Sequence, residues 1–257
     1  MNAWLEAALL GLVQGLTEWL PVSSSGHLQL TRALVGATPS TWYDLLLHVG
    51  TLFVVLWAYR RRIPVLVRAA FDRDAPEHRF AWGLVVGSVP IAVVGFAFQD
   101  LIEVAFTSLW AVGAALVFTG AFLASTRGLE GRCDVTPPRA WTIGLWQALA
   151  LLPGISRSGA AIAGGLHAGL DRETAADFAF LLAVPALVGA TLFKALDLGD
   201  EAVVTAPMVL GIAVSLVVGY ATLQWLRGVV ARRGVHAFAP YCVAVGGLTL
   251  WLASRGL

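Results

Sequence analysis

The chain has 257 residues, of which 58% are hydrophobic and only 13% are charged. A soluble domain usually carries about twice that share of charged residues, which excludes an ordinary soluble protein. The ten tryptophans are typical of a protein whose aromatic rings lie at membrane interfaces. The formal net charge of +1 identifies no partner by itself, and we expect membrane lipids but no nucleic acid as partners. Cys133 and Cys242 lie far apart without companion ligands, so they predict neither a disulfide framework nor a metal site.

Apolar windows of spanning length follow one another along the chain. A membrane-spanning helix needs about 20 predominantly apolar residues. The first window, 3–30, lacks a basic leading segment and contains Glu6, so we expect it to stay in the mature protein rather than to be cleaved as a signal. Plain spanning helices are predicted at about 42–59, 80–98, 108–125, 175–196, 203–226 and 237–254.

Two windows differ from these plain helices: 3–30 and 141–169 are each interrupted by a cluster of Pro, Gly and Ser. In lipid, broken backbone persists only where protein or a wet cavity satisfies its polar groups. These windows therefore predict helical hairpins that enter the membrane and turn back. The predicted fold is an all-α polytopic membrane protein with about six spanning helices and two re-entrant hairpins.

The loop charges predict an orientation. Arginines follow the windows that end near residues 59, 125 and 226, whereas the connections after residues 98 and 196 are acidic. By the positive-inside tendency the arginine-rich loops are cytoplasmic. The 141–169 hairpin then enters from the cytoplasm and the 3–30 hairpin from outside. Opposite entry of two similar hairpins is typical of an inverted-topology repeat.

A shift of 133 residues tests that repeat. It aligns identical residues in the two halves: Gln14 with Gln147, Ser23 with Ser156, Ser25 with Ser158, Gly26 with Gly159 and Asp44 with Asp177. The ungapped set predicts one integral membrane domain, 1–257, with a first repeat at about 1–125 and a second, inverted repeat at about 138–257.

The first break carries a dense set of polar side chains. Gln14 and Glu18 are four residues apart and share a helix face. Three serines, Gly26 and His27 follow Pro21. Exposed amides at a helix start, with hydroxyls and a glycine, favour an anion site. A serine helix cap beside a satisfied buried histidine explains this segment equally well.

The second break places Arg157 between Ser156 and Ser158 at mid-membrane depth. A guanidinium fork suits two phosphate oxygens and does not deprotonate to escape desolvation. The alternative is an ion pair with Glu18, Asp44 or Asp177; phosphate binding is favoured because intramembrane charges tend to be functional. If both hairpins meet at the midplane, the polar residues of the two breaks form one site.

These residues resemble the undecaprenyl-diphosphatase family, the bacitracin-resistance type of membrane phosphatase. One family signature runs from a Glu/Gln-x-x-x-Glu stretch into Pro-x-Ser-Ser-x-Gly-His, here residues 14–27, and the other is the Pro-Gly-x-Ser-Arg-Ser-Gly loop, here 153–159. The resemblance implies removal of the terminal phosphate from undecaprenyl diphosphate at the outer face of the bacterial cytoplasmic membrane. The product would be the monophosphate carrier for peptidoglycan and other cell-wall polymers.

The resemblance also implies roles for the matching residues. Glu18 would be a metal ligand or general acid/base, His27 an acid/base or phosphate ligand, and Ser24 the nucleophile or a phosphate contact. Arg157 would hold the diphosphate and stabilise charge on the moving phosphoryl group. The supporting phosphate-binding residues would be Ser23, Ser25, Ser156, Ser158 and Gly159.

A divalent cation, Mg²⁺ or Ca²⁺, is expected at Glu18, with Gln14 as a further ligand. Many relatives carry Glu where this chain has Gln14. An amide still offers an oxygen to a hard cation, but it lacks the charge that raises affinity.

Several residues and functions remain as alternatives. We expect Asp44 and Asp177 to cap or pair charges that hold the hairpins, and His48 to be a hydrogen-bond partner of Asp44. A polyprenyl-phosphate flippase could use the same headgroup site, whereas a small-ion channel would need rings of like charge. Hydrolysis is favoured because the set of Ser24, His27 and Glu18 exceeds what binding needs. A homodimer is left open.

Overall fold

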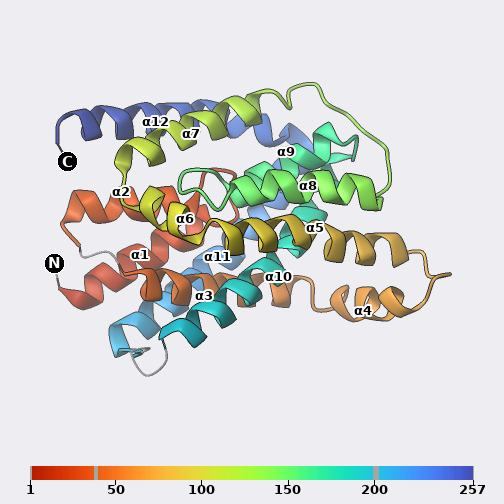
Figure 1. Ribbon diagram of the computed structural model, residues 1–257, viewed down its shortest axis with the longest axis horizontal. Helices are drawn as coiled ribbons and strands as arrows, with labels where there is room; N and C mark the ends of the chain where they lie inside the picture. The colour runs from red at the N-terminus through yellow and green to blue at the C-terminus, as the bar shows by residue number, and fades with distance from the viewer. Residues whose placement is uncertain (1, 38–39, 199–202, 257) are drawn as a thin grey trace.

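The computed structural model describes residues 2–37, 40–198 and 203–256, and these ranges contain helices and no strand (Figure 1). The first half comprises α1 Ala3–Thr17, α2 Ser24–Val35, α3 Thr41–Ala58, α4 Ile63–Phe71, α5 His78–Ala97, α6 Gln99–Phe106 and α7 Leu109–Ala124. The second half comprises α8 Pro137–Leu149, α9 Arg157–His167, α10 Arg172–Leu198, α11 Ala206–Arg233, the short 3₁₀ helix η2 Val235–Phe238 and α12 Ala239–Ser254.

The predicted spans are present, and two of them are bent. Four segments are long and apolar enough to cross a membrane singly, namely α5, α10, α11 and the η2–α12 segment Val235–Ser254. Two further spans form bent pairs, α3 with α4 at 77° and α6 with α7 at 99°. The polytopic all-helical fold is therefore confirmed. The sequence did not predict α4 and α6, because each is a short helix beyond a sharp bend at the end of an apolar window.

The two interrupted windows form pairs of short helices. The limbs α1 and α2 have 15 and 12 residues, and α8 and α9 have 13 and 11. At about 1.5 Å per residue none of them crosses about 30 Å of hydrocarbon alone. The chain turns through residues with positive φ, Ser23 at 69° in the first break and Gly154 at 98° in the second. A positive φ explains why a glycine occupies position 154, whereas Ser23 adopts a backbone conformation that is rare for a residue with a side chain.

Each hairpin packs against a span from the other half of the chain. Helix α1 lies along α11, and α8 lies along α5, while α7 and α12 run side by side (Figure 1). Glycines make the close approach possible, since a Cβ on Gly11 would collide with the backbone of Gly211 and one on Gly144 with that of Gly87. Small residues at crossings are how membrane helices gain van der Waals contact. Residues of both halves therefore surround the two breaks.

The element boundaries follow the predicted offset. Helix α2 begins at Ser24 and α9 at Arg157, 133 residues apart. The preceding Ser23 and Ser156 cap these helices, and each hydroxyl accepts a backbone N–H three residues on, from Gly26 and Gly159. This correspondence supports an inverted repeat with halves at about 1–125 and 138–257, which stays a prediction.

Candidate active site

The two broken segments meet, and serine side chains join them. The backbone N–H of Gly154 donates to Ser23 Oγ at 3.1 Å. In the other direction, Ser158 Oγ and Ser156 Oγ donate to the carbonyl of Leu20 at 3.0 and 3.4 Å. These bonds satisfy backbone groups that the breaks leave without helical partners. The polar residues of the two hairpins thus lie around one centre.

Glu18 occupies that centre, directly after α1. Its side chain is 4% exposed. Glu18 Oε2 accepts hydrogen bonds from Ser24 Oγ at 2.5 Å and from Gln14 Nε2 at 3.1 Å. The Gln14 contact is the one expected for residues four apart on a helix. A buried carboxylate needs such donors because desolvation penalises its charge.

Ser24, the first residue of α2, has the geometry of an activated nucleophile. Its hydroxyl faces a carboxylate at hydrogen-bond distance, so a proton can pass from Ser24 Oγ to Glu18 as the oxygen attacks. The Ser23 cap and the turn at positive φ set this direction, because they end the break and start α2 at Ser24.

Arg157 approaches the same carboxylate from the second hairpin. Its Nη2 lies 4.0 Å from Glu18 Oε1, and its side chain is 24% exposed. Within the part of the chain that the structure describes, the guanidinium makes no hydrogen bond. Of the three predicted ion-pair partners, Glu18 is the neighbour and Asp44 and Asp177 pair elsewhere. The fork of donors is therefore available to an anion.

His27 points to α12 instead of to Glu18. Its Nε2 lies 2.8 Å from Tyr241 Oη and its Nδ1 2.8 Å from the carbonyl of Ser23. The His27 and Tyr241 rings stack at 5.7 Å between centroids. Among the described residues, no hydrogen bond or ion pair joins the His27 side chain to Glu18, Ser24 or Arg157. The sequence did not predict a role for Tyr241, the third residue of α12.

The remaining serines have structural partners in this structure. Ser25 Oγ lies 3.2 Å from Ser23 Oγ, and Ser156 Oγ lies 3.2 Å from Ser158 Oγ. Ser23 and Ser156 are helix caps, as the alternative interpretation of the sequence predicts. Gly159 supplies the capped N–H of α9. A phosphate contact from these residues stays a prediction.

His48 on α3 belongs to the cluster, which the sequence interpretation missed. Its Nδ1 lies 2.7 Å from the backbone carbonyl of Asp44, and its Nε2 lies 3.3 Å from Glu18 Oε2. The predicted pairing with Asp44 therefore involves only the main chain. Thr51, one turn further along α3, lies 3.5 Å from Gln14 Nε2. Polar residues at 44, 48 and 51 of an apolar span were the available signal, because this spacing marks one helix face.

The two membrane aspartates have different partners. Asp44 forms an ion pair with Arg32 of α2 and so holds the first hairpin, as predicted. Asp177 does not hold the second hairpin, and that expectation was wrong. Its carboxylate accepts from Arg62 at 2.7 Å and from Tyr59 at 2.5 Å, which ties α10 to the bend after α3. The aspartate partner is thus set by tertiary packing rather than by the repeat.

Two oxygens at the centre could ligate a hard cation. Gln14 Oε1 is buried without a hydrogen-bond partner in the described ranges, and Glu18 Oε1 faces Arg157 only at 4.0 Å. Residues 2–37, 40–198 and 203–256 contain no group of three His, Cys, Asp or Glu side chains that could hold a metal. The donors fit Mg²⁺ or Ca²⁺ when phosphates and water complete the coordination, because these ions prefer oxygen ligands.

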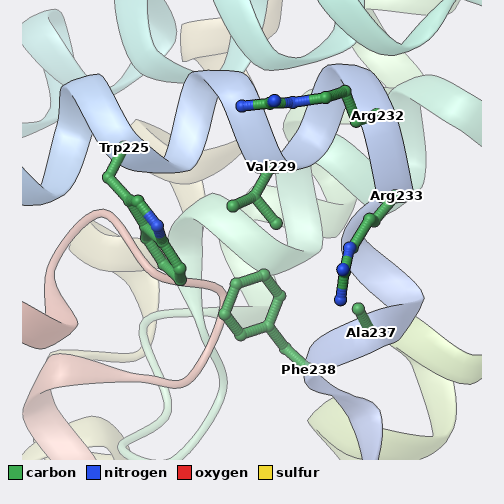
Figure 2. Close-up of a pocket in the computed structure, with 6 residues that line it drawn as sticks. All are labelled: Trp225, Val229, Arg232, Arg233, Ala237 and Phe238. Carbon is green, nitrogen blue, oxygen red and sulfur yellow. The ribbon is translucent and has the colours of Figure 1, made fainter.

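A pocket at the end of α11 lies outside this cluster. Its lining is made of Trp225, Val229, Arg232, Arg233, Ala237 and Phe238 (Figure 2). The rings of Trp225 and Phe238 meet edge to face at 6.3 Å. None of the residues discussed above lines it.

Fold and site together define a class: an α-helical integral membrane protein with a buried serine–carboxylate–arginine cluster where two broken segments meet. The family described as "Bacitracin resistance protein BacA" matches residues 7–248. This chain belongs to that family.

The chain is also similar over its whole length to proteins named undecaprenyl-diphosphatase. It is 45% identical to that of Desulfosudis oleivorans, with 98% of this chain and 99% of the relative covered. The Nocardioides sp. protein is 40% identical, covering 100% and 99%, and the Korarchaeum cryptofilum protein is 36% identical, covering 94% and 96%.

Proposed function

We propose that this chain hydrolyses undecaprenyl diphosphate to undecaprenyl phosphate and inorganic phosphate. The family and the names of the full-length relatives support this reaction. The observation that carries it is the 2.5 Å contact from Ser24 Oγ to Glu18 Oε2 beside the guanidinium of Arg157. A nucleophile, its base and an anion donor are thereby placed together.

In the proposed mechanism Ser24 Oγ attacks the terminal phosphorus and its proton passes to Glu18. The bond between that phosphorus and the bridging oxygen breaks, and undecaprenyl phosphate leaves with the electron pair. Glu18 passes this proton to the departing lipid phosphate and is again a carboxylate. Water then attacks the phosphoserine and Glu18 accepts the water proton. The bond between phosphorus and Ser24 Oγ breaks, and the proton returns from Glu18 to Ser24 as inorganic phosphate leaves. Arg157 stabilises the charge that spreads over the phosphoryl oxygens during transfer.

His27 and the supporting donors complete the proposed headgroup site. His27 stands at the start of α2, one turn after Ser23, where the free N–H groups of a helix N-terminus favour anions. We assign it a phosphate contact or an acid/base role, with its ring held by Tyr241. Ser23, Ser25, Ser156, Ser158 and Gly159 are proposed as further phosphate donors.

A divalent cation, Mg²⁺ or Ca²⁺, is proposed as the cofactor. Glu18 Oε1 and Gln14 Oε1 would hold it together with diphosphate oxygens. When bound, such an ion neutralises charge on the transferring phosphoryl group. Because Gln14 is neutral, the protein contributes a single carboxylate.

The cell location is also part of the proposal. The chain is an integral membrane protein, and we place it in the cytoplasmic membrane with the site open to the outer side. The loop charges support the orientation of the chain, since Arg60–Arg62 follow α3 at the end predicted to be cytoplasmic. The side on which the site opens rests on the resemblance to the family. We expect membrane lipids to surround it. The flippase alternative gains no support from the relatives, which are named for hydrolysis.

Phosphate release by purified protein in detergent tests the proposal, with undecaprenyl or farnesyl diphosphate as substrate and Mg²⁺, Ca²⁺ or EDTA present. We expect Ser24→Ala and Arg157→Ala each to lower kcat by about 100-fold or more, the usual loss when a nucleophile or transition-state donor is removed. Arg232→Ala is the matched control, since Arg232 Nε bonds to Gly228 of its own helix.

If the wild-type protein released no phosphate under any of the metal conditions, the proposed phosphatase activity would be refuted. Full activity of Arg157→Ala would remove that residue from the site. Labelled lipid phosphate in reconstituted vesicles separates hydrolysis from translocation, because a flippase moves the label to the other leaflet without releasing phosphate.

A further inference from the structure

Helix α3 contacts both limbs of the first hairpin through a single face. Asp44, His48 and Thr51 follow one another at spacings of four and three residues, which aligns them on a helix. Asp44 pairs with Arg32 of α2, while Thr51 contacts Gln14 of α1. Between them, His48 reaches Glu18 in the break itself.

The His48 ring is held at both nitrogens. Nδ1 lies 2.7 Å from the carbonyl of Asp44, and a carbonyl oxygen only accepts, so Nδ1 carries a proton. Nε2 lies 3.3 Å from Glu18 Oε2, which as a carboxylate oxygen also accepts. When Nε2 also carries a proton, the ring donates at both ends and the contact with Glu18 is an ion pair. With 14% of the side chain exposed, His48 has little room to turn elsewhere.

Three donors converge on a single oxygen of Glu18. Ser24, Gln14 and His48 all face Oε2, which leaves Oε1 toward Arg157. Gln14 brings no charge, and Arg157 is 4.0 Å away, so His48, when protonated, is the nearer cation. The contact fixes which oxygen receives the Ser24 proton, because a carboxylate bound on one oxygen does not rotate freely.

We propose that His48 is a positioning residue of the phosphatase site: it holds the Glu18 carboxylate in the orientation that accepts the proton of Ser24. This inference rests on the proposed function. His48 acts through Glu18 and does not touch the lipid. Its loss therefore lowers kcat and leaves KM unchanged, whereas loss of a headgroup ligand raises KM.

Two substitutions of His48 distinguish the effect of its hydrogen-bond donor from the effect of its side-chain volume. His48→Leu keeps bulk without a donor, and His48→Gln keeps an N–H that can reach Glu18. For His48→Leu we expect kcat to fall about 10- to 100-fold, the range typical for loss of a residue that orients a metal ligand, with KM within about twofold. His48→Gln should recover most of kcat.

His78→Leu is the matched control. His78 Nδ1 also lies 2.7 Å from a backbone carbonyl, that of Ala69, and it faces no carboxylate among the described residues. We expect its kcat per folded protein to equal that of the wild type. A wild-type kcat in His48→Leu would overturn the proposal, and so would a His48→Gln enzyme as slow as His48→Leu.

A second measurement needs no turnover. Thermal unfolding of His48→Leu, Glu18→Gln and the double variant forms a double-mutant cycle. Because the two side chains form a pair, the loss in melting temperature of the double variant should be clearly smaller than the sum of the losses of the two single variants. Additive losses would refute the contact. If the cycle shows coupling but the wild-type protein releases no phosphate, the contact stands and the proposed function is refuted. The two failures are therefore distinguishable.

Discussion

Glu18 shows how much a single buried carboxylate depends on its surroundings. An ion of this kind is destabilising in a membrane interior unless it is paired and hydrogen-bonded. Here Ser24 and Gln14 donate to it, Arg157 supplies positive charge, and His48 does so when protonated. The pairing that stabilises the carboxylate also places Ser24, the proposed nucleophile, against Glu18, its proposed base. Stability and chemistry therefore depend on the same contacts.

Gln14 gives a direct test of the proposed metal. Gln14→Glu would set a second carboxylate within hydrogen-bond distance of Glu18, where Gln14 Nε2 now donates at 3.1 Å. Two such charges repel unless a cation lies between them. We expect phosphate release by this variant to depend more steeply on Mg²⁺ or Ca²⁺ and to be lost in EDTA, measured as initial rate against metal concentration. Gln99→Glu at the start of α6 controls for added charge, and an unchanged metal dependence would place the cation away from residue 14.

At the scale of elements, the caps and glycines decide where helices start and how closely they pack. Ser23, Ser156 and Asp171 each cap the helix that follows. The sequence predicted the two breaks because Pro, Gly and Ser interrupt apolar windows. It did not predict the 77° bend after α3, since the apolar window simply ends there at Arg60–Arg62. Arg62 then bonds to Asp177 on α10, a contact between residues far apart in sequence.

Asp171 offers a stability prediction outside the membrane spans. Its carboxylate accepts from the backbone N–H groups of Glu173 and Thr174 and from the Thr174 hydroxyl, at 3.0, 2.9 and 2.6 Å. Burial raises the pKa of Asp171, but the bonds from Thr174 and Glu173 hold that pKa below its ordinary value. Asp171→Ala should destabilise the protein by about 1 kcal/mol, as for other helix caps.

The sign of the pH dependence follows from the lowered pKa. The stabilisation by Asp171 is complete above the unfolded pKa of about 3.9 and is lost as pH falls through the lower folded value. Thermal unfolding at pH 7 should therefore separate wild type from Asp171→Ala, and the difference should shrink at pH values below the folded pKa. A constant difference across that range would show that the cap acts without its charge.

At the scale of the whole molecule, the site requires both halves of the chain. Glu18 and Ser24 come from the first hairpin and Arg157 from the second, and each hairpin packs on a span of the opposite half. The halves differ in chemistry: the residues 133 positions after Glu18, His48 and Thr51 are Leu151, Leu181 and Val184. If the halves are copies, the second has no equivalent of the carboxylate cluster and contributes Arg157 instead.

The predicted topology is testable with the native cysteines. Cys133 is exposed in the connection between α7 and α8, where Arg127, Arg132 and Arg139 predict a cytoplasmic side. A membrane-impermeant maleimide should label Cys133 in inside-out vesicles and leave it unlabelled in intact spheroplasts. Cys242 is buried and should stay unlabelled in both, so Cys133→Ser is the blank. Labelling from the outside would reverse the entry sides of both hairpins.

The membrane spans, the two breaks and the residue types at their centre can be predicted from the sequence alone. Apolar length and the Pro, Gly and Ser clusters are local properties, so they can be identified without knowing the fold. Other contacts come from the packing of the helices: His48 faces Glu18, His27 turns to Tyr241 and Asp177 pairs with Arg62. Those contacts depend on how α3, α10 and α12 pack around the hairpins, and residues far apart in sequence carry no local pattern that specifies their partner.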